Sequence, residues 1–237
     1  NASRYQTTGF NSRPWTSTAN PDADGFKNDV LSGRVGYEFA PGHEANFAFM
    51  HSEGENQYDG SGVANDWRSQ SRQSSGLVSL KNALSRDWSS TLTVGQSVDK
   101  AVGLKDGVFQ SNFRTDQRQY GWQNDLRTVV GTFMLAAERR EQSVDTTTRY
   151  SVMERTNNSV LAGWTEKLGA HRFQANLRRD DNSQFGKKNT GSVGYGYRFS
   201  ENWRANMSYG TAFKAPTFND LYYPSTLSSG VTLVGNP

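Results

Sequence analysis

Apolar and polar residues alternate with a period of two along most of this chain, whereas helical spacing is nearly absent. In the segment 30–39, Leu31, Val35 and Tyr37 are apolar while Arg34 and Glu38 are polar. Successive side chains of a strand point to opposite faces, so this pattern predicts a strand with one apolar and one polar face. The same alternation recurs in the segments 45–49, 77–84, 91–95, 120–126, 132–138, 159–165, 172–178, 192–199 and 204–209. We therefore predict an all-β protein of about ten to eleven strands.

The connections between these segments alternate in length. Short turns are expected at 40–43, 85–87, 128–131, 167–170 and 200–202. Long polar loops are expected at 11–27, 54–70, 99–111, 143–153, 180–189 and after residue 212. Outer-membrane barrels have short periplasmic turns and longer extracellular loops, so the alternation favours an antiparallel up-and-down transmembrane β-barrel segment, not closed on its own. A soluble β-sandwich has no reason to keep every second connection short.

Strand parity gives a sharper prediction about the two faces of one sheet. The lipid-facing side should carry Leu31, Tyr37, Phe47, Tyr120, Phe133, Trp164, Phe173, Tyr195 and Tyr209. The opposite side should carry Arg34, Asn46, Gln123, Arg178, Arg198 and Arg204. A charge on the lipid face at the middle of a bilayer costs ~2–4 kcal/mol, so this parity should hold strictly. If each connection is a simple hairpin, the order of strands in the sheet should follow the sequence.

Aromatic residues beside the short turns support the membrane interpretation. Phe39, Trp88, Trp164, Phe199 and Trp203 lie there, in positions suited to a girdle at headgroup depth. The alternative is that they are the core aromatics of a sandwich. Aromatic residues make up 12% of the chain although 21% is charged, which disfavours disorder. No apolar stretch approaches the roughly 18 residues of a membrane-spanning helix.

Catalytic constellations are missing from the sequence. There is no cysteine, and His43, His51 and His171 lack the spacing of a zinc site or a catalytic triad. The net charge of +3 comes from scattered basic residues, without the clustered stripe that nucleic-acid binding needs. We expect neither an enzyme nor a nucleic-acid-binding protein.

Two stretches resemble a known family. The segment Tyr209-Gly-Thr-Ala-Phe-Lys-Ala-Pro-Thr-Phe-Asn-Asp-Leu-Tyr-Tyr223, followed by Gly235-Asn-Pro237, resembles the mid-barrel motif of TonB-dependent outer-membrane receptors. The segment Arg179-Asp-Asp-Asn-Ser-Gln-Phe-Gly186, with Trp122-Gln-Asn124, is similar to the vitamin B12 (cobalamin) transporter branch of that family. The similarity in strand spacing extends over nearly the whole chain.

The resemblance implies a receptor of 22 strands in the Gram-negative outer membrane, with an N-terminal plug inside the barrel. Residues 1–237 would be a partial barrel domain, surrounded by outer-membrane lipid, with the plug and the C-terminal strands absent. The implied activity is uptake of cobalamin with energy supplied through TonB, which contacts the missing plug. The first residues do not look like a signal peptide, and we expect them to lie within a longer protein.

Other cargoes and other classes of barrel stay open. A siderophore or haem receptor of the same family is one alternative. Haem receptors carry a ligating His after a box like Phe213-Lys-Ala-Pro216, and none follows here before Pro237. A passive porin or a surface adhesin is the second alternative, and plug sequence upstream would exclude it.

Acidic residues in two of the predicted loops are candidate metal ligands. Asp22 and Asp24 precede Gly25, a spacing of oxygen ligands that suits a hard cation such as Ca²⁺. An Asp/Gly turn held by side-chain bonds to the backbone is the alternative for this segment alone. The next long loop adds Asp59 and Asp66, and the two loops flank one hairpin and can converge. The resemblance implies that such residues bind calcium and order the loops for cargo, although Asn11 departs from the family's Asp.

Candidate cargo contacts are aromatic residues at two loop tips. We expect Tyr58 and Tyr150 to contact the cargo, together with plug residues outside this chain. Packing within the loops is the alternative role for both.

Overall fold

The computed structural model describes residues 1–13, 22–60, 65–224, 226–228, 231–233 and 235. Eleven strands form one antiparallel sheet, as predicted. They are β1 (Ala2–Thr7), β2 (Phe26–Ala40), β3 (His43–Tyr58), β4 (Trp67–Ala83), β5 (Trp88–Lys105), β6 (Val108–Thr128), β7 (Gly131–Thr146), β8 (Glu154–Leu168), β9 (His171–Asn182), β10 (Gly186–Arg198) and β11 (Arg204–Gly210). A short helix, α1 (Phe218–Tyr222), and a small hairpin of β12 (Thr226–Ser228) and β13 (Val231–Leu233) follow.

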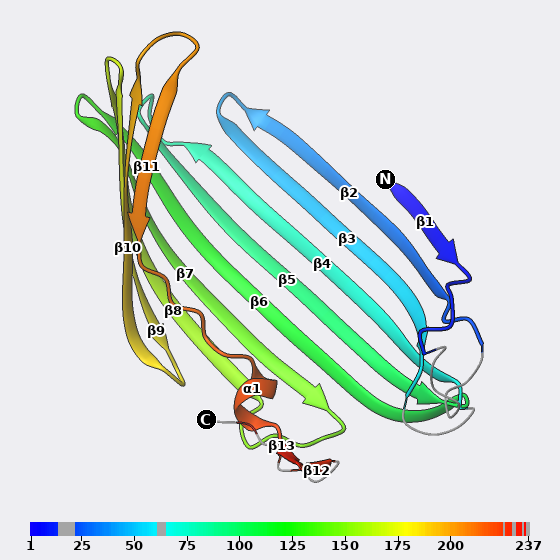
Figure 1. The fold of residues 1–237 in the computed structure, drawn as a ribbon. Helices are drawn as coiled ribbons and strands as arrows, with labels where there is room; N and C mark the ends of the chain where they lie inside the picture. Colours follow the sequence, from blue (N-terminus) through cyan, green and yellow to red (C-terminus); the bar gives the residue numbers. More distant parts are fainter. Residues whose placement is uncertain (14–21, 61–64, 225, 229–230, 234, 236–237) are drawn as a thin grey trace.

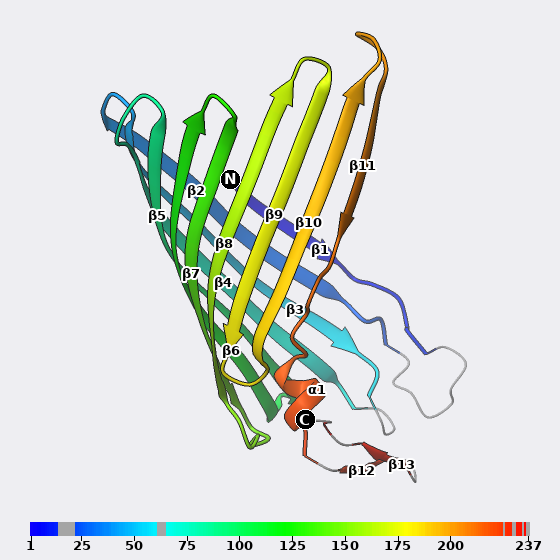
Figure 2. The same ribbon diagram turned by 90° about the vertical axis from the view of Figure 1, so that its left-hand side faces the viewer.

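The order of strands in the sheet is the order in the sequence, which confirms the prediction of simple hairpins. The strands are tilted side by side and the sheet curves into an open trough, with β1 at one edge and β11 at the other (Figures 1 and 2). The connections that follow even-numbered strands lie at one end of the trough. Those that follow odd-numbered strands lie at the other end, together with α1. We call these the turn end and the loop end.

The register confirms the predicted division into two faces. Residues directly opposite each other on paired strands share a face. Phe47 lies opposite Val78, which lies opposite Val94 on the next strand. The pairing continues from Val94 to Tyr120 and, further along the sheet, from Phe133 to Trp164. All nine predicted apolar residues fall on this outer face, and all six predicted polar residues fall on the inner face.

The outer face carries a band of exposed apolar side chains. Val35, Leu135, Leu177 and Tyr209 are between 61% and 75% exposed in the sheet alone. A contiguous apolar surface of this extent needs an apolar environment around it.

Polar groups within the apolar band bond to one another. Trp88 donates from Nε1 to Oδ1 of Asn124 at 3.1 Å, and Trp122 donates from Nε1 to Oγ of Ser90 at 2.9 Å. These pairs satisfy the polar groups that would otherwise face hydrocarbon.

Two of the predicted long loops are wrong. The expected loop 99–111 is a two-residue turn, Asp106 and Gly107, between strands that continue to Lys105 and from Val108. The expected loop 180–189 is likewise mostly strand, because β9 reaches Asn182 and β10 starts at Gly186. Strands project beyond the apolar band because pairing with a neighbour satisfies their backbone groups in water as well as in lipid.

The segment after residue 212, expected to be a polar loop, folds into α1 near the loop end of β7 and β8 (Figure 1). Thr217 caps the helix by accepting from the backbone N–H of Asp220, whose side chain accepts from the backbone N–H of Thr217. Among the described residues, the buried apolar side chains are Val144, Tyr150, Phe218 and Leu221, at 5–6% exposure. No described helix has the length and apolar character needed to cross a membrane.

Candidate functional site

The acidic residues of the first two loops converge at the loop end of the sheet. Asp22, Asp24 and Asp59 each place a carboxylate oxygen within 4.8 Å of the others. The hairpin of β2 and β3 brings the two loops together, as the sequence predicted. This acidic triad is accessible to solvent and could hold a cation.

Ser12 joins the two sides of the triad. Its backbone N–H donates to Oδ2 of Asp24 at 2.9 Å, and its hydroxyl donates to Oδ2 of Asp59 at 3.0 Å. Nearby, Nη1 of Arg13 donates to the carbonyl of Gly60 at 3.2 Å. Ser12 could not be predicted from the sequence, because its contacts depend on the conformations of two loops that are distant from each other in the sequence.

Partial burial and mutual repulsion both act on the carboxylates of the triad. The pKa of Asp22 is raised above its usual value, mainly because burial removes water from the carboxylate. The negative charge of Asp24 adds to the effect, with smaller contributions from Asp59 and Asp66. A cation would relieve the same repulsion.

Asp66, the fourth predicted ligand, is turned away from the triad. Its Oδ2 lies 2.7 Å from Nη2 of Arg68, and its backbone N–H donates to Oδ1 of Asp106 at 2.8 Å. Asp66 would have to leave this ion pair in order to add a fourth carboxylate.

The two candidate aromatic contacts differ in their surroundings. Tyr58 is 37% exposed on the inner face, with its ring 6.2 Å from that of Trp67. Lys105 places Nζ 5.3 Å from the centre of the Trp67 ring. Tyr150 is only 5% exposed and packs beside Phe113.

Tyr150 is also engaged by α1. Its hydroxyl donates to Asn219, and burial raises the pKa of that hydroxyl. A contact between Tyr150 and a cargo therefore requires α1 to move.

A basic hollow of about 400 Å³ lies on the inner face between β7, β8, β9 and the segment before α1. Arg155 donates from Nη1 to the carbonyl of Pro216 at 2.8 Å and lies 4.8 Å from the centre of the Phe218 ring. Nε of Arg140, which also lines the hollow, is buried without a hydrogen-bond partner among the described residues.

Arg178 organises a polar network beside this hollow. It donates from Nη1 to Glu138 at 2.9 Å and from Nη2 to Ser159 at 2.7 Å. Asp180 accepts from Nε of Arg178 at 3.0 Å and from the hydroxyl of Ser159 at 2.6 Å. The inner wall is therefore charged and internally bonded, as suits the water-filled side of a barrel.

The tilted antiparallel strands, the apolar outer band and the polar inner wall define part of an outer-membrane β-barrel. All 237 residues match the family model described as TonB dependent receptor-like, beta-barrel, and the chain belongs to this family. It is located in the Gram-negative outer membrane. The prediction that it is not an enzyme is confirmed, because the family consists of receptors, and the same match counts against a passive porin or an adhesin.

Curated relatives point to one branch of the family. The chain is 30% identical over 208 residues to a vitamin B12 transporter of Photobacterium profundum, covering 86% of this chain and 34% of the relative. It is 30% identical over 217 residues to a vitamin B12 transporter of Vibrio vulnificus, with the same coverage of both chains. The chain thus spans about a third of the length of these relatives.

Solved structures show the same fold. The siderophore receptor PirA from Pseudomonas aeruginosa superimposes with a TM-score of 0.71 at 16% identity, over 90% of this chain and 40% of that one. A mutant of the ferric enterobactin receptor PfeA, also from Pseudomonas aeruginosa, gives a TM-score of 0.72 at 14% identity, over 90% of this chain and 37% of the other. At these identities the likeness concerns the fold alone.

Proposed function

We propose that the chain is the barrel part of a longer outer-membrane transporter that takes up cobalamin with energy supplied through TonB. The observation that carries this proposal is the 30% identity to vitamin B12 transporters along 86% of the chain. A plug and further strands would complete the receptor, and TonB would act on the plug. Tyr58, exposed beside Trp67 on the inner face, is the better placed of the two candidate cargo contacts.

Calorimetric titration of the full-length receptor tests the cargo. We expect cyanocobalamin to bind more tightly than ferric enterobactin. Tighter binding of the siderophore complex would overturn the cobalamin assignment while leaving the family unchanged.

A siderophore receptor is the second candidate. The hollow on the inner face brings Arg140, Arg155, Arg178 and Lys214 together, and such a basic wall suits an anionic cargo. Charge neutralisation of Arg140 separates the two functions. Arg140→Gln should weaken an anionic siderophore complex much more than cobalamin.

We further propose that the acidic triad binds Ca²⁺ and thereby orders the first two loops for cargo. Carboxylate oxygens are the ligands that Ca²⁺ prefers, and Asp22, Asp24 and Asp59 already place theirs close together. An ion held by both loops would restrict their motion, and by linkage calcium and cargo would raise each other's affinity. Asp66 would join the site after leaving Arg68.

The test is the double substitution Asp22→Asn with Asp24→Asn, which removes two charges and keeps the side-chain shape. We expect Ca²⁺ binding to be lost in calorimetry and cobalamin affinity to become independent of calcium. Asp29→Asn, an outer-face aspartate paired with Arg4 at 3.4 Å, is the matched control and should bind Ca²⁺ normally. Unchanged calcium affinity in the double variant would remove the site from these loops.

A further inference from the structure

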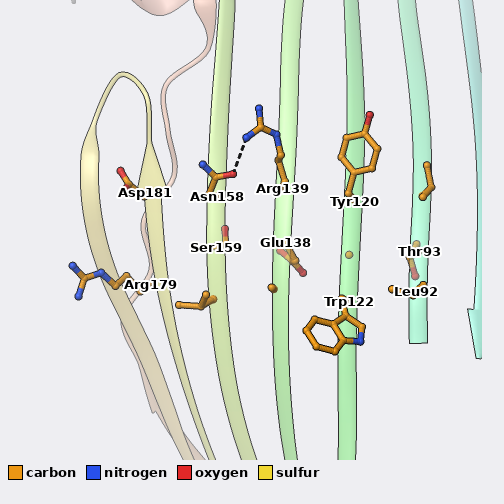
Figure 3. A pocket seen from close by; sticks show the side chains of 14 residues that line it. Leu92, Thr93, Tyr120, Trp122, Glu138, Arg139, Asn158, Ser159, Arg179 and Asp181 are labelled. Atoms are coloured by element: carbon orange, nitrogen blue, oxygen red, sulfur yellow. Dashed lines mark hydrogen bonds between the residues drawn. The ribbon is translucent and has the colours of Figure 1, made fainter. Parts of the chain in front are cut away.

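A hollow of about 650 Å³ lies on the outer face of the sheet, across β5 to β9 (Figure 3). Its floor is apolar, and the register places Trp122, Ala137 and Val160 side by side along it. Ala137 is small between two large neighbours, which leaves the floor recessed. The side of the sheet that faces lipid is therefore grooved at this point.

Two arginines border this groove, Arg139 on its loop-end side and Arg179 on its β9 side, in the same row as Ala137 and Val160 (Figure 3). Arg139 follows Ala137 on β7, and Arg179 lies opposite Val160 on β9. Asn158, on the strand between them, accepts from Nη1 of Arg139 at 3.4 Å (Figure 3). We call the hollow with this rim the arginine-rimmed groove.

The two arginines are close enough to act on one group. Two strand spacings of ~4.8 Å and an offset of two residues at ~3.3 Å put their α-carbons roughly 12 Å apart. In the structure the Arg179 guanidinium points away from Arg139 (Figure 3), and rotation of the two long side chains would be needed to bring both onto a single anionic group.

The charge of the rim is incompletely neutralised. Arg139 contacts Oε1 of Glu141 at 2.7 Å, but its side chain stays 51% exposed. Arg179 is exposed, and its side chain forms no hydrogen bond or ion pair with the described part of the chain. Asp181 also lines the groove, and Lys187 lies directly opposite it on β10.

Several outer-face arginines are held by an acidic neighbour, as Arg139 is by Glu141, whereas Arg179 is not. Arg4 is held by Asp29 at 3.4 Å, and Arg72 is held by Glu53 at 2.7 Å. An arginine at the border of an apolar band is costly unless its guanidinium reaches a polar partner at headgroup depth.

We propose that the arginine-rimmed groove binds a phosphorylated lipid of the outer leaflet. The phosphate would lie between Arg139 and Arg179, because guanidinium groups bind phosphate oxygens bidentately. An acyl chain would run over Ala137, between Trp122 and Val160. The loop end is the extracellular end of an outer-membrane barrel, so the arginines lie at the depth of outer-leaflet headgroups.

The chemistry of the groove favours a lipid over other occupants. A free anion would use only the rim and leave the apolar floor uncovered. A lipid presents both a charged group and a long apolar chain, and the groove offers arginines at its border and an apolar floor beside them. The inference depends on the membrane setting and not on the identity of the cargo.

Native mass spectrometry of the delipidated full-length receptor tests the proposal. The probes are a bisphosphorylated glycolipid of the outer leaflet, its dephosphorylated form, and inorganic phosphate. We expect only the phosphorylated glycolipid to be retained, and Arg139→Gln with Arg179→Gln to lower its retention about tenfold or more.

A matched control removes two charges from the other face. Arg172→Gln with Arg198→Gln changes inner-face residues of β9 and β10, and retention should stay at the level of the parent receptor. A second variant, Ala137→Trp, fills the floor without changing charge and should lower retention of the phosphorylated glycolipid.

Three outcomes would overturn the proposal. They are equal retention of the dephosphorylated glycolipid, equal losses in the control and the rim variants, and unchanged retention in both the rim and floor variants. Binding of inorganic phosphate at the same rim with no glycolipid retained would assign the rim to a free anion instead.

Discussion

An arginine placed at the middle of the apolar band tests the division of the sheet into two faces. Ala175 lies on the outer face of β9, directly opposite Trp164 on one side and Val193 on the other. Gln174, the preceding residue, points to the inner face. The substitutions Ala175→Arg and Gln174→Arg therefore introduce the same side chain one residue apart, once toward lipid and once toward water.

The magnitude follows from the depth of Ala175. The first outer-face charge on β9 is Arg179, four residues further on, and at ~3.3 Å per residue this is ~13 Å along the strand. With a strand tilt of ~40°, Ala175 lies about 10 Å below that charge, near the middle of an apolar band ~25 Å tall. Arginine at such a depth costs ~2–4 kcal/mol.

A cost of that size lowers the folding equilibrium constant roughly 30-fold to 700-fold. Because Ala175 is small, replacing it removes little apolar area. The loss of stability in Ala175→Arg therefore measures the cost of placing the charge in lipid. Gln174→Arg should stay within about 0.5 kcal/mol of the parent.

The assay is urea titration of the full-length receptor refolded into lipid vesicles, followed by tryptophan fluorescence and by heat-modifiable electrophoretic mobility. Thinner bilayers should reduce the cost of Ala175→Arg, because the guanidinium then reaches the interface more easily. Equal costs for the two variants, or a larger cost for Gln174→Arg, would refute the assignment of the faces.

Three further predictions address individual contacts. Trp88→Phe leaves Oδ1 of Asn124 without its donor on the lipid face and should cost ~1–3 kcal/mol in the same urea titration, whereas adding Asn124→Leu should restore most of the stability. Arg155→Met removes the hydrogen bond to the carbonyl of Pro216 and the contact with the Phe218 ring, which hold the segment before α1 on the sheet. Trypsin cleavage after Lys214 should therefore rise about tenfold. The control variant Arg149→Met should leave the cleavage rate unchanged. The raised pKa of Asp22 keeps that carboxyl protonated to a higher pH than an ordinary Asp. Calcium affinity should therefore begin to fall on acidification above pH 3.8, and a fall only below pH 3.8 would contradict this.

The sequence was most informative where lipid constrains it. Positions such as Phe47 and Arg178 could be assigned to faces because only one face of each strand tolerates hydrocarbon. Beyond the apolar band both faces meet water, so the polar residues 99–111 look like a loop although they are mostly strand. Asp106-Gly107 is a strong hairpin signal that could have located this turn, since both residues adopt positive φ, at 50° and 76°.

The candidate metal site was predictable in part. Convergence of Asp22, Asp24 and Asp59 follows from the hairpin between their loops. The capture of Asp66 by Arg68 was not predictable in the same way, because Asp66 precedes the start of β4 at Trp67 and its side-chain direction depends on the loop. The bridging role of Ser12 was not predictable either, because it depends on how two irregular loops meet.

Each strand pairs only with the strands before and after it in the sequence. This pairing determines how the sheet of such a barrel can change over evolutionary time. Inserting or deleting one hairpin alters the circumference by two strands, yet every other strand keeps its partners, its direction and its outward face. A single added strand would instead reverse the direction of everything after it. The hairpin is therefore the unit in which barrels of this kind can grow or shrink, whereas loops at the extracellular end can diversify without disturbing the wall.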